Sequence, residues 1–164
     1  MRSLAVPLAA LLAAGAAGCS SRGAPSGSAP AEGEAADVFR DRTDQELDAA
    51  LSAARDQARR EDKRVLLEFV APWCVDCREV SRVAQQEPAA SVLREKYVVV
   101  PVNVGRFDRH KALLREHGVQ VIAALVVLDA DGKRVAKTTL EPITKRAALT
   151  AEELAAWLRA PAGT

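Results

Sequence analysis

Two cysteines, Cys74 and Cys77, carry the most specific chemistry in the sequence, because a Cys-x-x-Cys pair can alternate between a dithiol and a disulfide. The pair follows Trp73 and the apolar run 65–70, so we expect the chain to pass from a buried strand directly into a helix. At the first turn of that helix, unpaired backbone N–H groups and the positive end of the helix dipole favour a thiolate. Cys74 is therefore the predicted nucleophile. Cys77, one turn further along the same face, is the predicted resolving thiol that attacks the mixed disulfide.

The pair also has two other interpretations, a metal site and a structural disulfide. A structural zinc site needs four ligands, and the further candidates are His110 and His117, whose separation exceeds the usual gap of about three to five residues. We therefore predict no metal site, and we expect both histidines on one solvated face of a helix. A structural disulfide stays open, because the chain carries the marks of export to a compartment where disulfides persist. Metal binding by the dithiol alone is a third, minor alternative.

The N-terminal sequence predicts export and a lipid anchor. Residues 1–18 have the pattern of a signal peptide, in which Arg2 precedes an apolar run that is short for a membrane span and ends in small residues. The junction 16–19 is similar to a bacterial lipobox, which predicts lipidation of Cys19. The alternative is ordinary cleavage with Cys19 left as a free thiol, a liability in an oxidising compartment. Residues 19–36 are rich in Ser, Gly, Ala, Pro and Glu and are expected to form a flexible tether.

The charge balance gives no sign of a polyanionic partner. The chain has 23 basic and 22 acidic side chains, so no general field attracts nucleic acid or an anionic membrane surface. We therefore expect no nucleic-acid partner, and partner choice must depend on local surfaces.

The remaining sequence predicts an α/β domain with helices covering a sheet. Capping boxes at 43–46 and 150–153 mark the starts of the first and last helices. Pro101 lacks an amide hydrogen, so its strand is expected near a sheet edge or at a bulge. The expected order is a helix from Thr43 ending in the charged run 59–64, strand 65–70, a motif helix ending before Pro88, a helical turn at 91–96, strand 97–104, a helix over about 108–117, a hairpin of strands 124–128 and 134–139, and a final helix.

This order, with Trp-Cys-x-x-Cys at the junction of strand and helix, resembles the thioredoxin fold throughout residues 38–160, within a domain expected to span 37–164. The resemblance implies a central mixed β-sheet of four to five strands flanked by helices. Within that superfamily, the segment 46–77 is most similar to the C-terminal thioredoxin-like domain of the DsbD transmembrane thiol reductases. The stretches 102–108 and 128–133 are similar to segments of exported bacterial thioredoxin-like proteins.

The resemblance assigns roles to residues around the dithiol. Glu68 stands where thioredoxins carry a buried acid, so it is expected to have a raised pKa and to accept the proton of Cys77; the alternative is a structural carboxylate paired with Lys or Arg. Trp73 is expected beside the sulfurs, either shaping a docking face or filling the core. Ala123 replaces the cis-proline usual in the family, so the Ile122–Ala123 peptide is expected to be trans, or strained if it is cis, and the substrate groove is expected to be altered.

Together these features predict a thiol-disulfide oxidoreductase of the bacterial cell envelope, lipid-anchored and facing the periplasm, more reductant than oxidant. Its expected partners are protein thiols or disulfides, with a membrane thiol reductase as electron donor, and no cofactor is predicted. The alternative is a redox-inert thioredoxin-like binding or scaffold module with a structural Cys74–Cys77 disulfide. The absence of proline at Ala123 is the main support for that alternative.

Overall fold

The computed structural model describes residues 38–144 and 147–162, so the predicted signal peptide, Cys19 and the tether lie outside the described residues. The elements are α1 (Asp44–Glu61), β1 (Arg64–Val70), α2 (Val75–Ala84), α3 (Ala89–Lys96), β2 (Tyr97–Asn103), α4 (Lys111–His117), β3 (Ala124–Leu128), β4 (Arg134–Thr139), α5 (Leu140–Thr144) and α6 (Ala151–Arg159).

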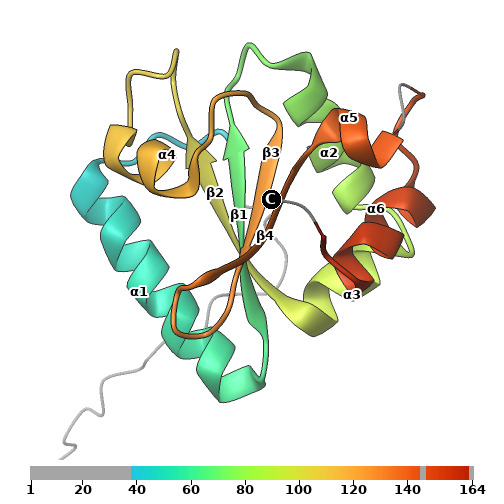
Figure 1. The fold of residues 1–164 in the computed structure, drawn as a ribbon, viewed down its shortest axis with the longest axis horizontal. Coiled ribbons are helices and arrows are strands. Elements are labelled where there is room, and N and C mark those ends of the chain that lie inside the picture. The colour runs from blue at the N-terminus through green and yellow to red at the C-terminus, as the bar shows by residue number, and fades with distance from the viewer. Residues whose placement is uncertain (1–37, 145–146, 163–164) are drawn as a thin grey trace, which may run out of the picture. The chain divides into compact units, whose positions relative to one another are not determined.

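The described strands form one mixed four-stranded sheet in the order β2-β1-β3-β4. β1 and β2 are parallel, whereas β3 is antiparallel to both β1 and β4. Helices α1 and α4 lie on one side of this sheet, and α2, α3, α5 and α6 lie on the other (Figure 1). This arrangement confirms the predicted α/β thioredoxin fold, with four strands.

The apolar sequence of β1 suits its position between two other strands in the interior of the sheet. Every residue of β1 after Arg64 is buried, as expected for an apolar strand that helices cover on both faces. β2 is an edge strand, and Pro101, which has no amide hydrogen to donate, lies within it opposite Glu68 of β1. The prediction of an edge position for this strand is confirmed.

Side-chain caps fix the starts of the first and last helices. Thr43 and Thr150 are the N-caps of α1 and α6, and each forms a complete capping box with the glutamate three residues later, Glu46 or Glu153. The Tyr97 hydroxyl donates a 2.6 Å hydrogen bond to the carbonyl of Leu158, which ties α6 to the start of β2. None of the helices in the described ranges is both long and apolar enough to cross a membrane.

The helix predicted at 108–117 begins later than expected, at Lys111. The preceding turn contains Phe107 and His110 with positive φ angles of 63° and 50°, which no right-handed helix accommodates. The Asp108 carboxylate accepts the backbone N–H of Arg106 at 2.8 Å, so this side chain stabilises the turn instead of a helix. The short helix α5 was not predicted.

The expectation that both histidines are solvated is wrong. His110 is buried, and its Nδ1 lies 2.6 Å from Oδ1 of Asp44, at the start of α1. His117 is 2% exposed, and its ring meets the Phe69 ring edge-on at a centroid separation of 6.4 Å. Its Nε2 is buried without a hydrogen-bond partner in the described part of the structure. The apolar side of α4 faces the sheet, and His117 lies on that side. The spacing of the two histidines along the sequence does not indicate that they are buried.

Replacement of His117 by Leu should flatten the pH dependence of stability on the acid side of neutrality. Burial lowers the pKa of His117 from 6.5, with a smaller opposing effect of Glu116 and contributions from Arg134 and Arg55 in the same direction as burial. The unfolded chain therefore binds the proton more readily, and the wild-type protein should lose stability as the pH falls through and below about 6.5. Urea unfolding measured between pH 8 and pH 5 tests this.

The same variant at pH 8 provides the control, since His117 is neutral there and any difference reports packing alone. Parallel stability curves for wild type and His117→Leu across the whole range would show that protonation of this ring has no part in acid sensitivity.

Candidate functional site

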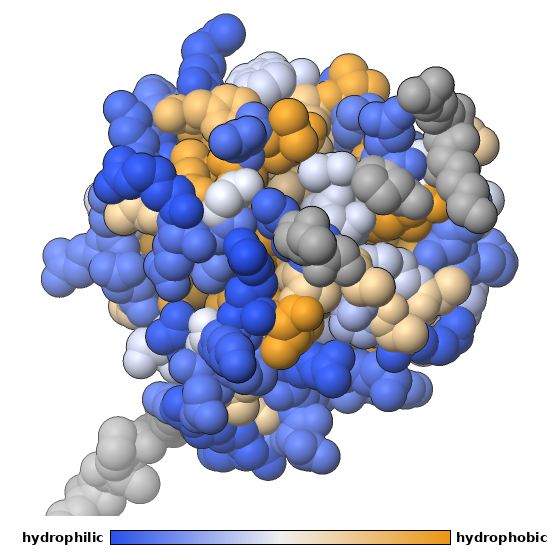
Figure 2. Space-filling view, in the orientation of Figure 1, coloured by the Kyte–Doolittle hydropathy of each residue, from blue (hydrophilic) through white to orange (hydrophobic). Residues whose placement is uncertain are grey.

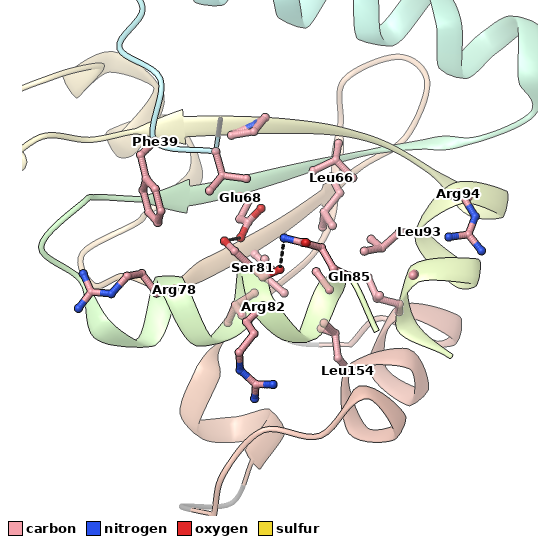
Figure 3. Close-up of a pocket in the computed structure, with 18 residues that line it drawn as sticks. Phe39, Leu66, Glu68, Arg78, Ser81, Arg82, Gln85, Leu93, Arg94 and Leu154 are labelled. Carbon is pink, nitrogen blue, oxygen red and sulfur yellow. Dashed lines mark hydrogen bonds between the residues drawn. The ribbon is translucent and has the colours of Figure 1, made fainter. Parts of the chain in front are cut away.

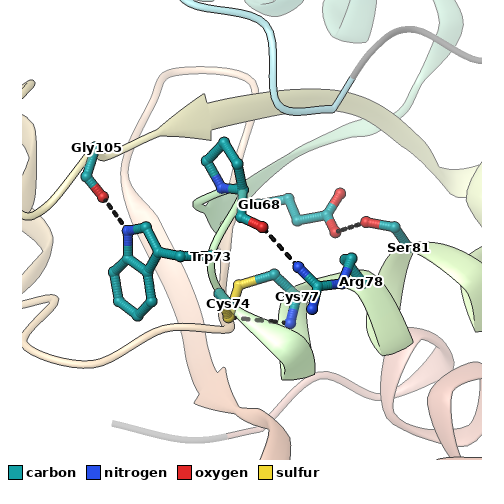
Figure 4. Close-up of a disulfide and its surroundings, with 8 residues drawn as sticks. Glu68, Trp73, Cys74, Cys77, Arg78, Ser81 and Gly105 are labelled. Carbon is teal, nitrogen blue, oxygen red and sulfur yellow. Dashed lines mark hydrogen bonds between the residues drawn. A yellow bond between two sulfur atoms is a disulfide. The ribbon is translucent and has the colours of Figure 1, made fainter.

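Cys74 and Cys77 form a disulfide at the N-terminus of α2, with Cα atoms 5.3 Å apart (Figure 4). Cys74 is the N-cap residue, and its Sγ accepts the backbone N–H of Cys77 at 3.0 Å. Cys74 retains 5% exposure whereas Cys77 has none, so the first sulfur is the more accessible of the two. An N-cap sulfur that already accepts a backbone N–H is placed where the reduced form favours a thiolate. The geometry fits the predicted division into nucleophile and resolving cysteine.

Trp73 lies at the surface beside the disulfide, on the side away from Glu68 (Figure 4). Its side chain is 49% exposed, and its indole Nε1 donates a 2.7 Å hydrogen bond to the carbonyl of Gly105. The Phe107 ring lies 6.5 Å from it, centroid to centroid, in a tilted arrangement. A residue so exposed does not fill the core, so Trp73 is available to contact a partner.

The loop that holds Trp73 depends on Asn103, which the sequence did not single out as a functional candidate. The Asn103 side chain is buried at the end of β2, where its oxygen accepts the Gly105 N–H at 3.0 Å. Its amide donates to the carbonyl of Phe39 and to Asp41 Oδ1, both at 2.7 Å. Gly105 has a φ of 58°, which favours glycine, and a Cβ there would lie 2.3 Å from Asp108 Oδ1, so any other residue would have to displace the Asp108 carboxylate. In the sequence, the Asn-x-Gly segment that follows the strand indicates this tight turn.

Glu68 is buried in β1 and contacts α2 through one hydrogen bond. The residue is 6% exposed, and the Ser81 hydroxyl donates to its Oε1 at 3.1 Å. Burial raises the pKa of Glu68 to about 7, and the Ser81 hydrogen bond opposes this increase. Among the described residues the hydrogen-bond partner is this hydroxyl and not a Lys or Arg, so the predicted alternative of a paired structural carboxylate is not what the structure shows.

Ser81 is a further site residue that the sequence did not identify. It follows Cys77 by one helical turn and is buried together with Val80 and Val83 on the inner face of α2. A hydroxyl on an otherwise apolar face needs a buried partner, and Glu68 provides it. In the sequence, the sign of this role is a single polar residue, Ser81, among the inward-facing valines of the helix.

The expectation for the Ile122–Ala123 peptide is wrong, because this bond is cis. A non-proline peptide bond prefers trans locally. Ala123 is buried and packs within the core. Ala124, the next residue, pairs with Phe69 of β1, so Ala123 lies at the end of the sheet from which the chain continues to Cys74. Val121, just before this bond, is exposed.

Arg78 joins the start of α2 to the segment before the cysteines. Its guanidinium donates a 2.6 Å hydrogen bond to the carbonyl of Pro72 (Figure 4).

No cluster of three or more His, Cys, Asp or Glu side chains suited to a metal ion occurs within the described ranges.

Comparisons with known proteins agree with this geometry. A family model described as thioredoxin-like matches residues 46–130. The chain is 36% identical over 90 residues to the thiol:disulfide interchange protein DsbD of Neisseria meningitidis, a match that covers 52% of this chain and 15% of DsbD. The solved C-terminal domain of that DsbD, in its oxidised form, has a TM-score of 0.52 and 26% identity, covering 74% of this chain and 96% of the domain. A disulphide isomerase from Xylella fastidiosa has the same fold, with a TM-score of 0.64 at 24% identity over 74% of this chain and 95% of the isomerase.

The chain therefore belongs to the thioredoxin-like family. More particularly, it is homologous to thiol-disulfide oxidoreductases, the DsbD C-terminal domain among them, and it carries a Cys74–Cys77 disulfide. The match spans a small part of DsbD, 15% of its length.

Replacement of Glu68 by Gln should remove a loss of stability that wild type shows as the pH rises. The folded protein holds the Glu68 proton up to about pH 7, whereas the unfolded chain releases it near the ordinary pKa of 4.5. Between these values the folded state binds more protons, so stability is full below pH 4.5 and falls as the pH rises through 7. The complete change corresponds to roughly 3 kcal/mol. Denaturant unfolding between pH 4 and pH 8 measures it.

The Ser81→Ala variant supplies the matched comparison, because it keeps the acid and removes its hydrogen-bond donor. The pKa of Glu68 should then exceed the wild-type value, measured from the carboxyl carbon shift of ¹³C-labelled glutamate across the pH range. An unchanged midpoint in Ser81→Ala would mean that the hydroxyl does not stabilise the ionised form.

Proposed function

We propose that this chain is a lipid-anchored thiol-disulfide oxidoreductase of the bacterial envelope that reduces disulfides of other proteins through its Trp-Cys-Val-Asp-Cys motif. The observation that carries the proposal is the Cys74–Cys77 disulfide at the start of α2, with the more accessible sulfur at the N-cap. The homology to thiol-disulfide oxidoreductases supports the same activity.

In the first step the thiolate of Cys74 attacks one sulfur of a substrate disulfide. A mixed disulfide forms between Cys74 and that sulfur, and the other substrate sulfur leaves as a thiolate that takes up a proton from water. The exposed side chains of Trp73 and Val75, on either side of Cys74 in the chain, support docking of the substrate, since they give an apolar surface next to the nucleophile. The face of the molecule in Figure 2 is largely hydrophilic, with apolar groups between the polar ones.

In the second step Cys77 loses its proton and attacks the Cys74 sulfur. The Cys74–Cys77 disulfide forms, the second substrate sulfur leaves as a thiolate that takes up a proton from water, and the protein is oxidised by two electrons while the substrate is reduced by two. Glu68 in its ionised form takes the Cys77 proton. A carboxyl with a pKa of about 7 is suited to this exchange, because it can accept and release a proton at neutral pH. The state with the disulfide formed is the one in the structure.

A new cycle requires reduction of the Cys74–Cys77 disulfide by an external dithiol. A membrane thiol reductase of the envelope is the donor that fits an exported protein. The signal-peptide pattern at 1–18 and the lipobox-like junction at Cys19 support a location at the membrane, facing the periplasm, with residues 19–36 as the tether.

Separate serine variants of the two cysteines should distinguish the nucleophile from the resolving thiol. Cys77→Ser should accumulate a mixed disulfide with a protein substrate, because Cys74 can attack but nothing resolves the product. Cys74→Ser should form no such adduct. Both variants should lose insulin reduction to the uncatalysed rate, measured by turbidity, with adducts identified by mass spectrometry after acid quenching.

The reduction potential of the wild-type chain decides between this activity and a redox-inert module with a structural disulfide. A potential above about −300 mV, from equilibration with dithiol buffers, supports the proposal. A potential well below that value, or no insulin turnover by protein with a confirmed reduced dithiol, would refute it.

Cys19→Ser should abolish membrane attachment in cells without affecting the redox centre. Wild type should incorporate an alkyne-tagged fatty acid and sediment with membranes, whereas Cys19→Ser should do neither. Cys77→Ser is the matched control, since it also replaces one cysteine by serine and should remain labelled. Equal labelling of wild type and Cys19→Ser would rule out lipidation at this residue.

A further inference from the structure

The indole of Trp73 is held in place by the turn that follows β2. Its Nε1 donates to the Gly105 carbonyl at 2.7 Å (Figure 4), and the tilted Phe107 ring lies 6.5 Å away, centroid to centroid. Trp73 directly precedes Cys74 in the chain and is 49% exposed, so packing on the core restrains its ring only in part. The orientation of the indole next to the nucleophile therefore depends on the Gly105 carbonyl and the Phe107 ring.

Asn103 fixes the position of that turn from inside the protein. The residue is 3% exposed, and its side-chain oxygen accepts the Gly105 N–H at 3.0 Å. Its amide donates to the Phe39 carbonyl and to Asp41 Oδ1, both at 2.7 Å, so both amide hydrogens have acceptors. The Asn103 side chain thus ties the turn at Gly105 to the segment that leads into α1, and it cannot shift without breaking these hydrogen bonds.

A groove beside the indole brings these groups together. Trp73, Asn103 and Gly105 all line this groove, which has a volume of about 330 Å³. A larger cavity, between the sheet and the helices α2, α3 and α6, includes neither Trp73 nor a cysteine in its wall (Figure 3). The surface next to Cys74 is therefore the one that the Asn103 hydrogen bonds shape.

An indole that is already ordered favours the docking of a protein chain. An exposed side chain that rotates freely loses conformational entropy when a partner immobilises it, and this loss weakens binding. The contacts of Trp73 restrict its ring before a partner arrives, so less entropy remains to be lost. A protein substrate extends on both sides of its disulfide and can cover the indole, whereas a small disulfide reaches little beyond the sulfur of Cys74.

We propose that Asn103 is a positioning residue for protein substrates. Through the turn at Gly105 it holds Trp73 in one orientation beside Cys74, and it thereby favours the disulfides of proteins over small disulfides. The inference rests on the proposed function, because it requires that Cys74 attacks disulfides of other proteins.

Asn103→Ala should lower the preference of the reduced protein for a protein disulfide. The rate constants for insulin and for bis(2-hydroxyethyl) disulfide are measured by acid quenching, alkylation and mass spectrometry. Their ratio should fall roughly two- to tenfold, the range that corresponds to the loss of one hydrogen bond. A general change in thiol reactivity would alter both rate constants together and leave the ratio as it is. Thr138→Ala is the matched control, since Thr138 is a buried polar residue of the other edge strand, β4, and should keep the wild-type ratio.

The same variant should release the indole of Trp73, which is measured without any substrate. The two tryptophans give two indole N–H signals in the ¹⁵N-labelled protein, and Trp157, which donates to the Ala162 carbonyl at 2.9 Å, is the internal reference. The heteronuclear NOE of the Trp73 indole should fall in Asn103→Ala, while that of Trp157 should keep its wild-type value.

A double-mutant cycle tests whether Asn103 acts through the indole. Trp73→Phe keeps an aromatic ring and removes the Nε1 donor, so adding Asn103→Ala to it should change the ratio little further. Asp41→Ala gives a variant that does not disturb the core, because the Asp41 side chain is 65% exposed and accepts from the Asn103 amide. Its ratio should shift in the same direction as that of Asn103→Ala.

Three results would overturn the inference: an unchanged ratio in both Asn103→Ala and Asp41→Ala, an unchanged NOE of the Trp73 indole, or additive effects in the double-mutant cycle. Absence of any reaction between the reduced wild-type protein and insulin would instead refute the proposed function, on which the role of Asn103 depends.

Discussion

The site depends on the direct passage from β1 into α2. β1 is buried in the middle of the sheet and ends at Val70, and α2 begins at Val75. The four residues between them must turn the chain and leave Cys74 as the N-cap, with its backbone N–H bonded to the carbonyl of Ala71 at 3.0 Å. The sulfur therefore meets the free N–H groups of the helix start because of the fold, and no separate positive side chain is needed to place it.

The same constraint explains why an acid can be kept inside the central strand. A buried carboxylate is costly unless it is hydrogen-bonded, and β1 itself offers only backbone groups already used in the sheet. α2 crosses the β1 face and supplies the Ser81 hydroxyl to Glu68, which reduces the cost without removing it. The buried carboxyl therefore lowers the stability of the fold but provides a group that titrates near neutral pH, a compromise common at functional sites.

The elements that depend on sequence periodicity and caps could be predicted, and those that depend on tertiary packing could not. The capping boxes at Thr43 and Thr150 involve residues close in sequence, so their pattern was sufficient. His117 is buried because α4 packs on Phe69, a contact between distant residues that helical spacing alone does not reveal. The cis Ile122–Ala123 peptide could not be predicted either, since local preference for a non-proline bond favours trans.

The inner face of α2 connects the disulfide with the buried carboxyl of Glu68. Cys77 and Ser81, four residues apart, are buried on the inner face of α2, whereas Gln85 is the exposed C-cap residue of this helix. Cys77 is bonded to Cys74 at one end, Ser81 holds Glu68 in the middle, and Gln85 donates from its amide to the Ser81 carbonyl at 3.2 Å. The residue that supports the buried acid therefore lies on the same helix as the resolving cysteine, one turn further along.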